Sequence, residues 1–217
     1  MSSLLSAVQW HLAQFGLVAY RRQLVFYRRL PGAPHGAWFR PAGFEFRFVH
    51  LEELEPLQYP GGWLTLPEAR QWLERGDSDM LAAIRDNRIC SYLWVERRVA
   101  RIEFLDVEAP LPAGHVYISK VLVMPPWRRH GLASAMYQYF ASREPALAAH
   151  SACVPNNAPM HLLFSKLQWQ PRLLISSWRV ARLRWHRVED TYTGQKTGFL
   201  SARRAASLLF SEGEIDG

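Results

Sequence analysis

Apolar and polar residues alternate along the chain with the periods that are typical of strands and helices. Residues 115–123 form an apolar run rich in β-branched residues, which predicts a buried strand. Pro125 and Pro126 end this strand, because proline cannot donate a hydrogen bond to a sheet. The residues after Gly131 have helical spacing, and their apolar side carries Leu132, Ala135, Met136, Tyr139 and Phe140. This stretch therefore predicts a strand, a glycine-containing loop and a helix in succession.

The same patterns predict further strands and helices. Residues 45–49 alternate and predict the first core strand, and two apolar runs around the polar turn 86–88 predict a hairpin over residues 80–95. Thr65 and Glu68 have the form of a capping box and predict a helix that ends near Gly76. The other predicted elements are a short helix at 51–57, strands at 101–107, 173–175 and 178–188, and a short amphipathic segment at 199–210.

The N-terminal residues precede this core. Residues 4–15 have an apolar stripe at helical spacing, and Gly16 is a suitable stop. The helix has no Lys or Arg on its polar face, which favours packing on the domain over peripheral contact with a membrane. Residues 17–30 predict two short strands, arranged as a hairpin. We divide the chain into an N-terminal extension at 1–43, a core domain at 44–188 and a C-terminal tail at 189–217.

Composition narrows the function classes. The net charge of +7 suits an anionic ligand or surface, but the arginines come in separated pairs and no nucleic-acid module is present, which argues against nucleic-acid binding. The chain has no apolar run of about 18 residues and no signal-peptide pattern, so we expect a cytoplasmic protein without a membrane span. Cys90 and Cys153 are not in a metal-ligand spacing, so we expect reduced thiols and no metal site.

The loop between the predicted strand and helix has the features of an anion site. The helix begins directly after it, so backbone N–H groups and the positive end of the helix dipole face the loop. Gly131 and Ala133 are small enough to let an anion approach the backbone, and Arg128 and Arg129 add positive charge.

Two motifs resemble those of one enzyme superfamily. Arg128, Gly131 and Ala133 match the Arg/Gln-x-x-Gly-x-Gly/Ala loop of the GCN5-related N-acetyltransferases, which binds the pyrophosphate of coenzyme A. Residues 157–169 resemble the Asn-x-x-Ala-x-x-x-Tyr-x-x-x-Gly-Phe segment of the same superfamily, in the expected order along the chain. The chain departs from that segment at the alanine, tyrosine and glycine positions, which hold Met160, Phe164 and Gln168.

The resemblance implies a fold, a reaction and a cosubstrate. The fold is of the α/β (α+β) class, with a mixed, mostly antiparallel central sheet flanked by helices. The reaction is transfer of an acetyl or other acyl group from acetyl-CoA to an amine in a ternary complex. The backbone of the strand would align the thioester, the loop amides would hold the pyrophosphate and Asn157 would contact the pantetheine arm. The implied coenzyme A set is Val121, Leu122, Val123, Arg128, Arg129, His130, Gly131, Leu132, Ala133, Ser134, Asn157 and Phe164.

The catalytic groups are less clear from the sequence. Relatives often place a carboxylate near the position of Tyr117, and this chain has none there. Glu103, Asp106, Glu108 and His115 are the nearby alternatives for a general base. The phenyl ring of Phe164 has no proton to give, so the acid candidates are Tyr117, Tyr137, His161 or a water. We select Tyr117, His115 and Glu103 as candidate catalytic residues.

The sequence leaves three functions open. The first is an N-acetyltransferase acting on a small amine, an amino sugar or a protein amine. The second is a transferase of longer acyl chains to a lipid or glycan precursor, and the third is a coenzyme A-binding regulatory protein with impaired chemistry. The superfamily places the acceptor near its first helices, so Tyr59, Trp63 and Trp72 are candidate lining residues. The edge at 173–188 could also pair two copies in a homodimer.

Overall fold

The computed structural model describes residues 20–33, 39–104, 106–180 and 183–210. Its strands are β1 (Tyr20–Arg29), β2 (Glu45–Val49), β3 (Ser78–Arg85), β4 (Arg88–Glu96), β5 (Val99–Ile102), β6 (Val107–Pro110), β7 (His115–Val123), β8 (Ala148–Cys153), β9 (Gln170–Val180) and β10 (Leu183–Asp190). Its helices are the 3₁₀ turns η1 (Leu51–Glu53) and η2 (Pro125–Trp127) and the α-helices α2 (Leu66–Glu74), α3 (Leu132–Arg143), α4 (Ala158–Lys166) and α5 (Ala202–Leu209).

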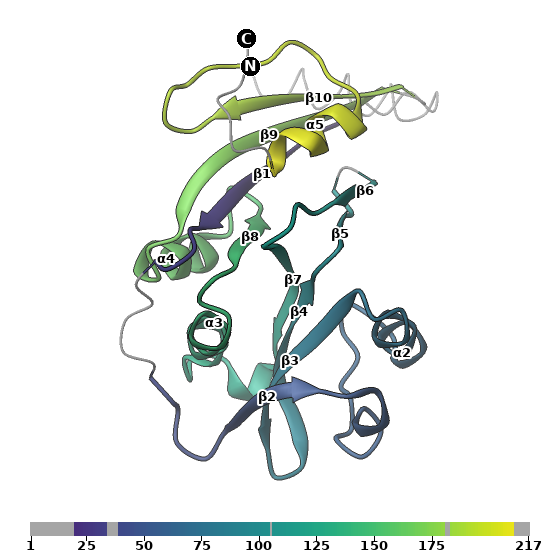
Figure 1. Cartoon of the computed structure of the whole chain (residues 1–217), viewed down its shortest axis with the longest axis vertical. Coiled ribbons are helices and arrows are strands. Elements are labelled where there is room, and N and C mark those ends of the chain that lie inside the picture. The colour runs from purple at the N-terminus through teal and green to yellow at the C-terminus, as the bar shows by residue number, and fades with distance from the viewer. Residues whose placement is uncertain (1–19, 34–38, 105, 181–182, 211–217) are drawn as a thin grey trace, which may run out of the picture.

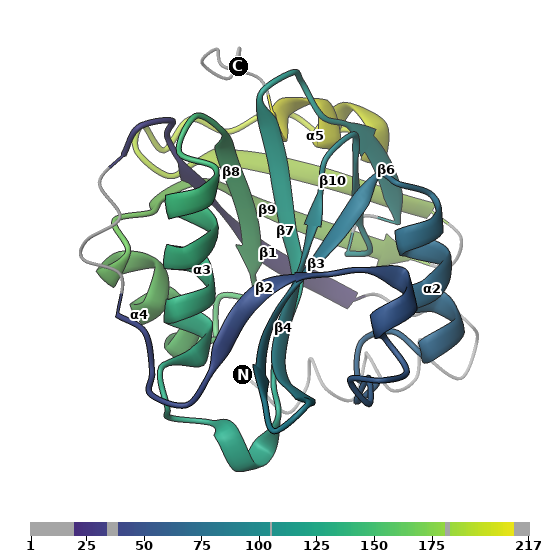
Figure 2. The same ribbon diagram turned by 60° about the horizontal axis from the view of Figure 1, so that its bottom comes forward.

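One large sheet dominates the structure (Figure 1). It has eight strands in the order β10-β9-β1-β8-β7-β4-β3-β2, and β5 and β6 form a separate two-stranded sheet. Among the described strands only β7 and β8 pair in parallel. Helices α3 and α4 lie on one face of the large sheet and α2 on the other (Figure 2). The predicted fold class, a mostly antiparallel mixed sheet flanked by helices, is confirmed.

Most of the predicted local elements are present. The first core strand, the hairpin β3–β4, the strand β7 and the helices α2 and α3 lie where the pattern placed them. The predicted strand at 101–107 is wrong: the chain turns there, with Asp106 at φ 56°, and forms the hairpin β5–β6. The helix expected at 51–57 is shorter and ends as a 3₁₀ turn at Glu53. The helix predicted at 4–15 lies outside the described residues, as do residues 211–217.

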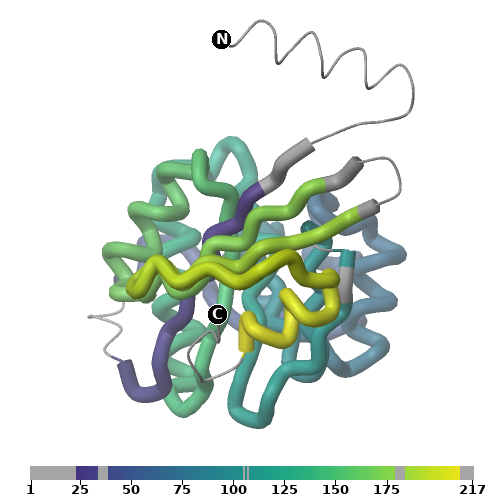
Figure 3. The backbone as a smooth tube through the Cα atoms, turned by 90° about the horizontal axis from the view of Figure 1, so that it is seen from above, coloured from purple at the N-terminus to yellow at the C-terminus, as the bar shows by residue number. Residues whose placement is uncertain are grey.

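The N-terminal strand β1 is an interior strand of the sheet. A hairpin was expected at 17–30, but residues 20–29 form one strand that pairs with β8 on one side and β9 on the other. Two ladders of hydrogen bonds satisfy the backbone of this strand, which a turn at its centre would break. Figure 3 shows β1, β9 and β10 running side by side. Residues 44–188 alone therefore do not carry the whole sheet.

The C-terminal residues also pack against the core. Helix α5 contributes Ala205, Ala206 and Leu209 to a buried cluster with Val188 of β10 and Ala109 of β6. Part of the segment expected to be a tail therefore covers one end of the sheet. Among the described residues, none of the helices has the length and hydropathy needed to cross a bilayer.

Strands β7 and β8 separate partway along their length. They pair only from His115 to Ile118 on β7 in the described structure, and the last two residues of β8 continue their pairing with β1. On its other edge β7 has a bulge against β4, because Lys120 is at φ 49° and shifts the register. A bulge bends the strand that carries it. The result is an opening between β7 and β8 beyond Ile118 and Ser151.

A buried histidine pair in the paired part of β7 and β8 makes stability depend on pH. Nε2 of His150 lies 3.0 Å from Nδ1 of His115, and His150 is buried. Burial, and then the nearby charges of His115, Arg28 and Arg172, lower the pKa of His150 from 6.5 to about 3. The unfolded chain therefore binds a proton at His150 that the folded chain rejects, and the free energy of unfolding falls as the pH drops from 6.5 toward 3.

We expect His150→Gln to reduce the loss of stability in acid. The contribution of one such group is about 1.4 kcal/mol per pH unit within this window. Urea unfolding of both proteins at neutral and mildly acidic pH measures it, with the exposed His130→Gln as the matched control. An acid sensitivity that is equal in the wild type and in His150→Gln would contradict this assignment.

Candidate active site

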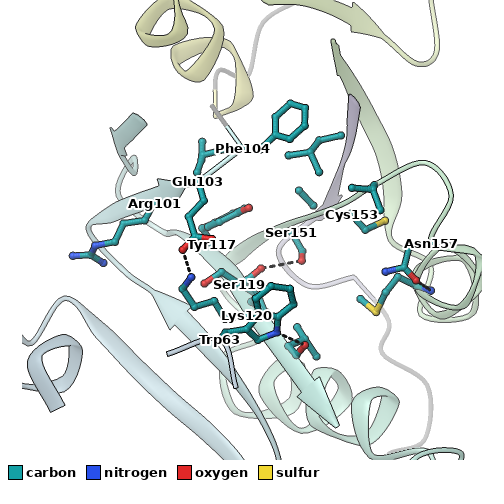
Figure 4. A pocket seen from close by; sticks show the side chains of 17 residues that line it. Trp63, Arg101, Glu103, Phe104, Tyr117, Ser119, Lys120, Ser151, Cys153 and Asn157 are labelled. Atoms are coloured by element: carbon teal, nitrogen blue, oxygen red, sulfur yellow. Dashed lines mark hydrogen bonds and ion pairs between the residues drawn. The ribbon is translucent and has the colours of Figure 1, made fainter. Parts of the chain in front are cut away.

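A cavity of about 300 Å³ lies at the opening between β7 and β8 (Figure 4). One wall comes from β7 and the other from the end of β8 and the start of α4, and the segment after β5 and the loop before α2 close the sides. The lining residues include Trp63, Glu103, Phe104, Tyr117, Ser119, Lys120, Val121, Ser151, Cys153, Asn157 and Met160.

The loop after β7 has the geometry of an anion site. Gly131 is the N-cap of α3 at φ 75°, in the left-handed region, and no side chain caps this helix. The first N–H groups of α3 therefore have no partner within the helix, and they lie at the positive end of its dipole. Arg129 is also left-handed, at φ 68°, and the side chains of Arg128 and Arg129 are exposed beside the loop. A Cβ on Gly131 would meet Phe39 at an ordinary 3.9 Å, so there is room for a side chain at this position. Glycine is favoured here because of the positive φ angle.

Two residues of the segment 157–169 were predicted to contact the cosubstrate. One of them lines the cavity and the other lies in the core. Asn157 is the N-cap of α4, where its side chain accepts a hydrogen bond from the backbone N–H of Met160 at 3.3 Å, and it lines the cavity. Phe164 is fully buried and stacks on Tyr27 with 4.4 Å between ring centroids. It is a core residue and does not line the cavity, so its predicted contact with coenzyme A does not fit this structure.

Two of the three selected catalytic residues lie at the cavity, and the third does not. Tyr117 and Glu103 line the cavity. Burial raises the pKa of Tyr117 further above its ordinary value, and Glu103 forms an ion pair with Lys120. His115 lies at the start of β7, stacked on His150, and is not among the lining residues.

The other candidates selected from the sequence also lie in different parts of the structure: some in the core, some at the surface and one at the cavity. Tyr137 is buried on α3, with its hydroxyl 3.2 Å from Oγ of Ser151, and His161 of α4 receives a hydrogen bond from Tyr27. Asp106 and Glu108 are exposed and pair with Arg184 and Arg101. Of the three aromatic candidates for the acceptor wall, Trp63 lines the cavity, whereas Tyr59 and Trp72 pack in the core with Tyr92 and Trp94.

The sequence reasoning missed one carboxyl group, Glu96. It is the last residue of β4 and is fully buried. Its carboxylate accepts hydrogen bonds from the Ser119 hydroxyl and, at 2.6 Å, from the backbone N–H of Arg101. Burial raises the pKa of Glu96 to about 7, although these hydrogen bonds and the Arg101 guanidinium act in the opposite direction. Because Ser119 lines the cavity, a carboxyl group that titrates near neutral pH is connected to the cavity through a hydroxyl.

The residues around Glu96 in the sequence give only a weak indication that it is a buried, functional acid. The residue directly follows the apolar run of β4, where an acid can equally be the first exposed residue after the strand. The pairing of β4 with β7 places Glu96 opposite Tyr117 and beside Ser119, and this register depends on contacts between distant segments.

A family model and solved structures match this chain. The model of the acetyltransferase (GNAT) family matches residues 48–168. No curated protein matches the chain. A tandem GNAT protein from the clavulanic acid biosynthesis pathway is 15% identical, with a TM-score of 0.52, over 79% of this chain and 57% of that one. A putative GNAT acetyltransferase from Novosphingobium aromaticivorans is 16% identical, with a TM-score of 0.50, over 72% of this chain and 63% of that one.

A third structure, a protein of unknown function from Staphylococcus epidermidis, is 8% identical, with a TM-score of 0.50, over 85% of this chain and 67% of that one. At these identities the likeness shows the fold alone. The chain spans 56–67% of the length of the first three solved structures that it matches. The family model, in contrast, covers more than half of this chain and includes β7, the anion loop, α3 and α4. The chain therefore belongs to the acetyltransferase (GNAT) family.

Proposed function

We propose that this protein transfers an acetyl group from acetyl-CoA to an amine in a ternary complex, with Glu96 as the general base acting through Ser119. The observation that carries the proposal is the buried Glu96 carboxyl group, whose pKa is near 7, joined by the Ser119 hydroxyl to a cavity lined by the β7 residues that lead to the anion loop. Family membership supports the use of an acyl-CoA, and the residues of the cavity supply the rest of the argument.

The anion loop would hold the diphosphate of the cosubstrate. The uncapped N-terminus of α3, the left-handed backbone at Arg129 and Gly131, and the exposed Arg128 side chain all favour a phosphate group there. Strand β7 runs from this loop to the cavity, and Asn157 faces it from α4. A pantetheine arm bound along β7 would present its thioester to the cavity, and that thioester supplies the activated acyl group.

Glu96 suits the removal of a proton from the acceptor. An alkylamine is mostly protonated at neutral pH and releases one proton to solvent before it attacks as the neutral amine, and the attacking nitrogen then has to lose a second proton. In our proposal the amine gives a proton to Oγ of Ser119, while the Ser119 hydroxyl proton passes to the Glu96 carboxylate. A base whose pKa lies near the working pH combines a large ionised fraction with useful basicity.

The same pair can return the proton to the leaving thiolate. Burial raises the pKa of both Tyr117 and Tyr137, so ionising either phenol is more costly than in water. Protonated Glu96, with its pKa near 7, is a stronger acid than either phenol. The absence of a hydroxyl at Phe164 is therefore compatible with turnover, because Glu96 serves as base and then as acid through Ser119.

The proposal is tested by following coenzyme A release from acetyl-CoA in the presence and absence of amines. We expect release that depends on an amine and that yields the acetylated amine in equal amount. If acetyl-CoA raises the melting temperature but no amine is acetylated, the protein is better described as a coenzyme A-binding regulatory protein.

A further inference from the structure

The cavity wall opposite Ser119 carries a thiol that the proposed transfer does not use. Cys153 is the last residue of β8, and it lies between Ser151 and Asn157 (Figure 4). Its Sγ is 3.7 Å from Nδ1 and 3.8 Å from Nε2 of His161 on α4. The hydroxyl of Tyr27 on β1 contacts the same imidazole. A nucleophilic atom therefore lies beside a histidine at the place where the acyl-CoA cavity ends.

The surroundings of His161 can accommodate an added proton. Nε2 lies 3.1 Å from the carbonyl oxygen of Val154, which can only accept, so Nε2 carries a hydrogen and Nδ1 accepts from the Tyr27 hydroxyl. If Nδ1 gains a proton, the Tyr27 oxygen can accept the hydrogen bond instead. Both N–H groups of the imidazolium would then have acceptors, so protonation leaves neither of them unsatisfied.

We propose that Cys153 is a site of S-acylation by the acyl-CoA bound in this cavity. The proposal rests on the proposed function, because it requires an acyl-CoA there. The Cys153 S–H bond breaks and its proton moves to the Tyr27 oxygen, whose own proton passes along the existing hydrogen bond to Nδ1 of His161, while Sγ attacks the acyl carbon. A bond forms between that carbon and Sγ, the bond to the sulfur of coenzyme A breaks, and the departing thiolate takes the proton from His161. The products are an S-acyl cysteine and free coenzyme A.

The reaction is expected to be slower than transfer to an amine. Burial raises the pKa of the Cys153 thiol to about 11, so the thiol is protonated at neutral pH and depends on His161 to lose its proton. Cys90, the other cysteine of the chain, provides a matched comparison. It is buried on β4, where Sγ lies 3.5 Å from the carbonyl oxygen of Arg88, and it does not line the cavity.

The experiment compares the full chain with its Cys153→Ala, Cys90→Ala and His161→Gln variants. Each protein is incubated with acetyl-CoA, quenched in acid and analysed by intact mass and peptide mapping, before and after neutral hydroxylamine, which cleaves thioesters. We expect one hydroxylamine-sensitive acetyl group on the wild type and on Cys90→Ala, none on Cys153→Ala, and at least tenfold slower labelling of His161→Gln. Cys153→Ser, which keeps the side-chain size, is the second variant if Cys153→Ala folds poorly.

The melting temperature with and without acetyl-CoA is measured on the same samples. If acetyl-CoA stabilises the wild type but no acetyl group is found on Cys153, the S-acylation proposal is wrong and the proposed function stands. Labelling of Cys153→Ala at the wild-type level also overturns the proposal, because the acetyl group is then elsewhere. If acetyl-CoA neither stabilises nor labels the protein, both proposals fail.

Discussion

Glu96→Gln is expected to lower kcat/KM for amine acetylation by about 10²- to 10⁴-fold, the range that a positioned general base contributes. Glutamine keeps the size of the side chain and can still accept hydrogen bonds from Ser119 and Arg101, but it cannot take a proton. In the wild type we expect kcat/KM to rise with pH to a plateau, with a midpoint near the Glu96 pKa of about 7. Initial rates measured across neutral pH for both proteins give the size of the loss and the midpoint.

Two further carboxylates make this test specific. Glu52→Gln is the matched control, because Glu52 is an exposed acid on η1 that does not line the cavity, and its variant is expected to stay close to the wild-type rate. Glu103 does line the cavity, and the sequence pattern selected it as a catalytic candidate. A large loss in Glu103→Gln with none in Glu96→Gln would move the base to Glu103 and contradict the present assignment.

Gly131→Glu is expected to remove the stabilisation that acetyl-CoA gives to the folded protein. The substitution puts a negative side chain at the N-terminus of α3 and forces a non-glycine residue to φ 75°. A ligand at about 100 times its Kd stabilises the folded state by roughly 2.7 kcal/mol, and we expect the variant to lose most of this. Thermal unfolding with and without acetyl-CoA measures the difference.

A control variant has to distinguish the loss of acetyl-CoA binding from the destabilisation that a strained backbone causes. Gly76 lies after α2 at φ 64°, and a Cβ there would meet no atom within 4 Å. Gly76→Glu therefore adds the same charge and a similar backbone strain away from the anion loop. We expect both variants to be less stable than the wild type, and only Gly131→Glu to lose the response to acetyl-CoA. An undiminished response in Gly131→Glu would show that the diphosphate is not bound at this loop.

The parts of the fold that depend on nearby residues could be predicted from the sequence. The run at 115–123, the prolines after it and Gly131 gave β7, the anion loop and the start of α3, because each follows from side-chain periodicity or from backbone preferences within a few residues. The hairpin β3–β4 has the same origin, since its turn at Asp86 and Asn87 has a local sequence signature.

The parts that depend on pairing between distant segments could not be predicted. The position of β1 between β8 and β9 joins residues 20–29 to strands more than a hundred positions later, and alternation within β1 cannot reveal its neighbours. The site has the same limitation. Glu96 reaches Ser119 only through the register of β4 and β7, and Cys153 reaches His161 and Tyr27 only when β8, α4 and β1 are assembled.

The most direct test of the central claim is to incubate the wild type and Glu96→Gln with acetyl-CoA and a mixture of amines. The mixture contains an arylalkylamine, an amino sugar and a lysine-containing peptide, and mass spectrometry quantifies each acetylated product together with free coenzyme A. We predict amine-dependent release of coenzyme A by the wild type, matched by one class of acetylated amine and reduced at least 100-fold in Glu96→Gln. Equal product formation by the two proteins would contradict the role of Glu96, and wild-type protein that binds acetyl-CoA but acetylates no amine would contradict the proposed transfer itself.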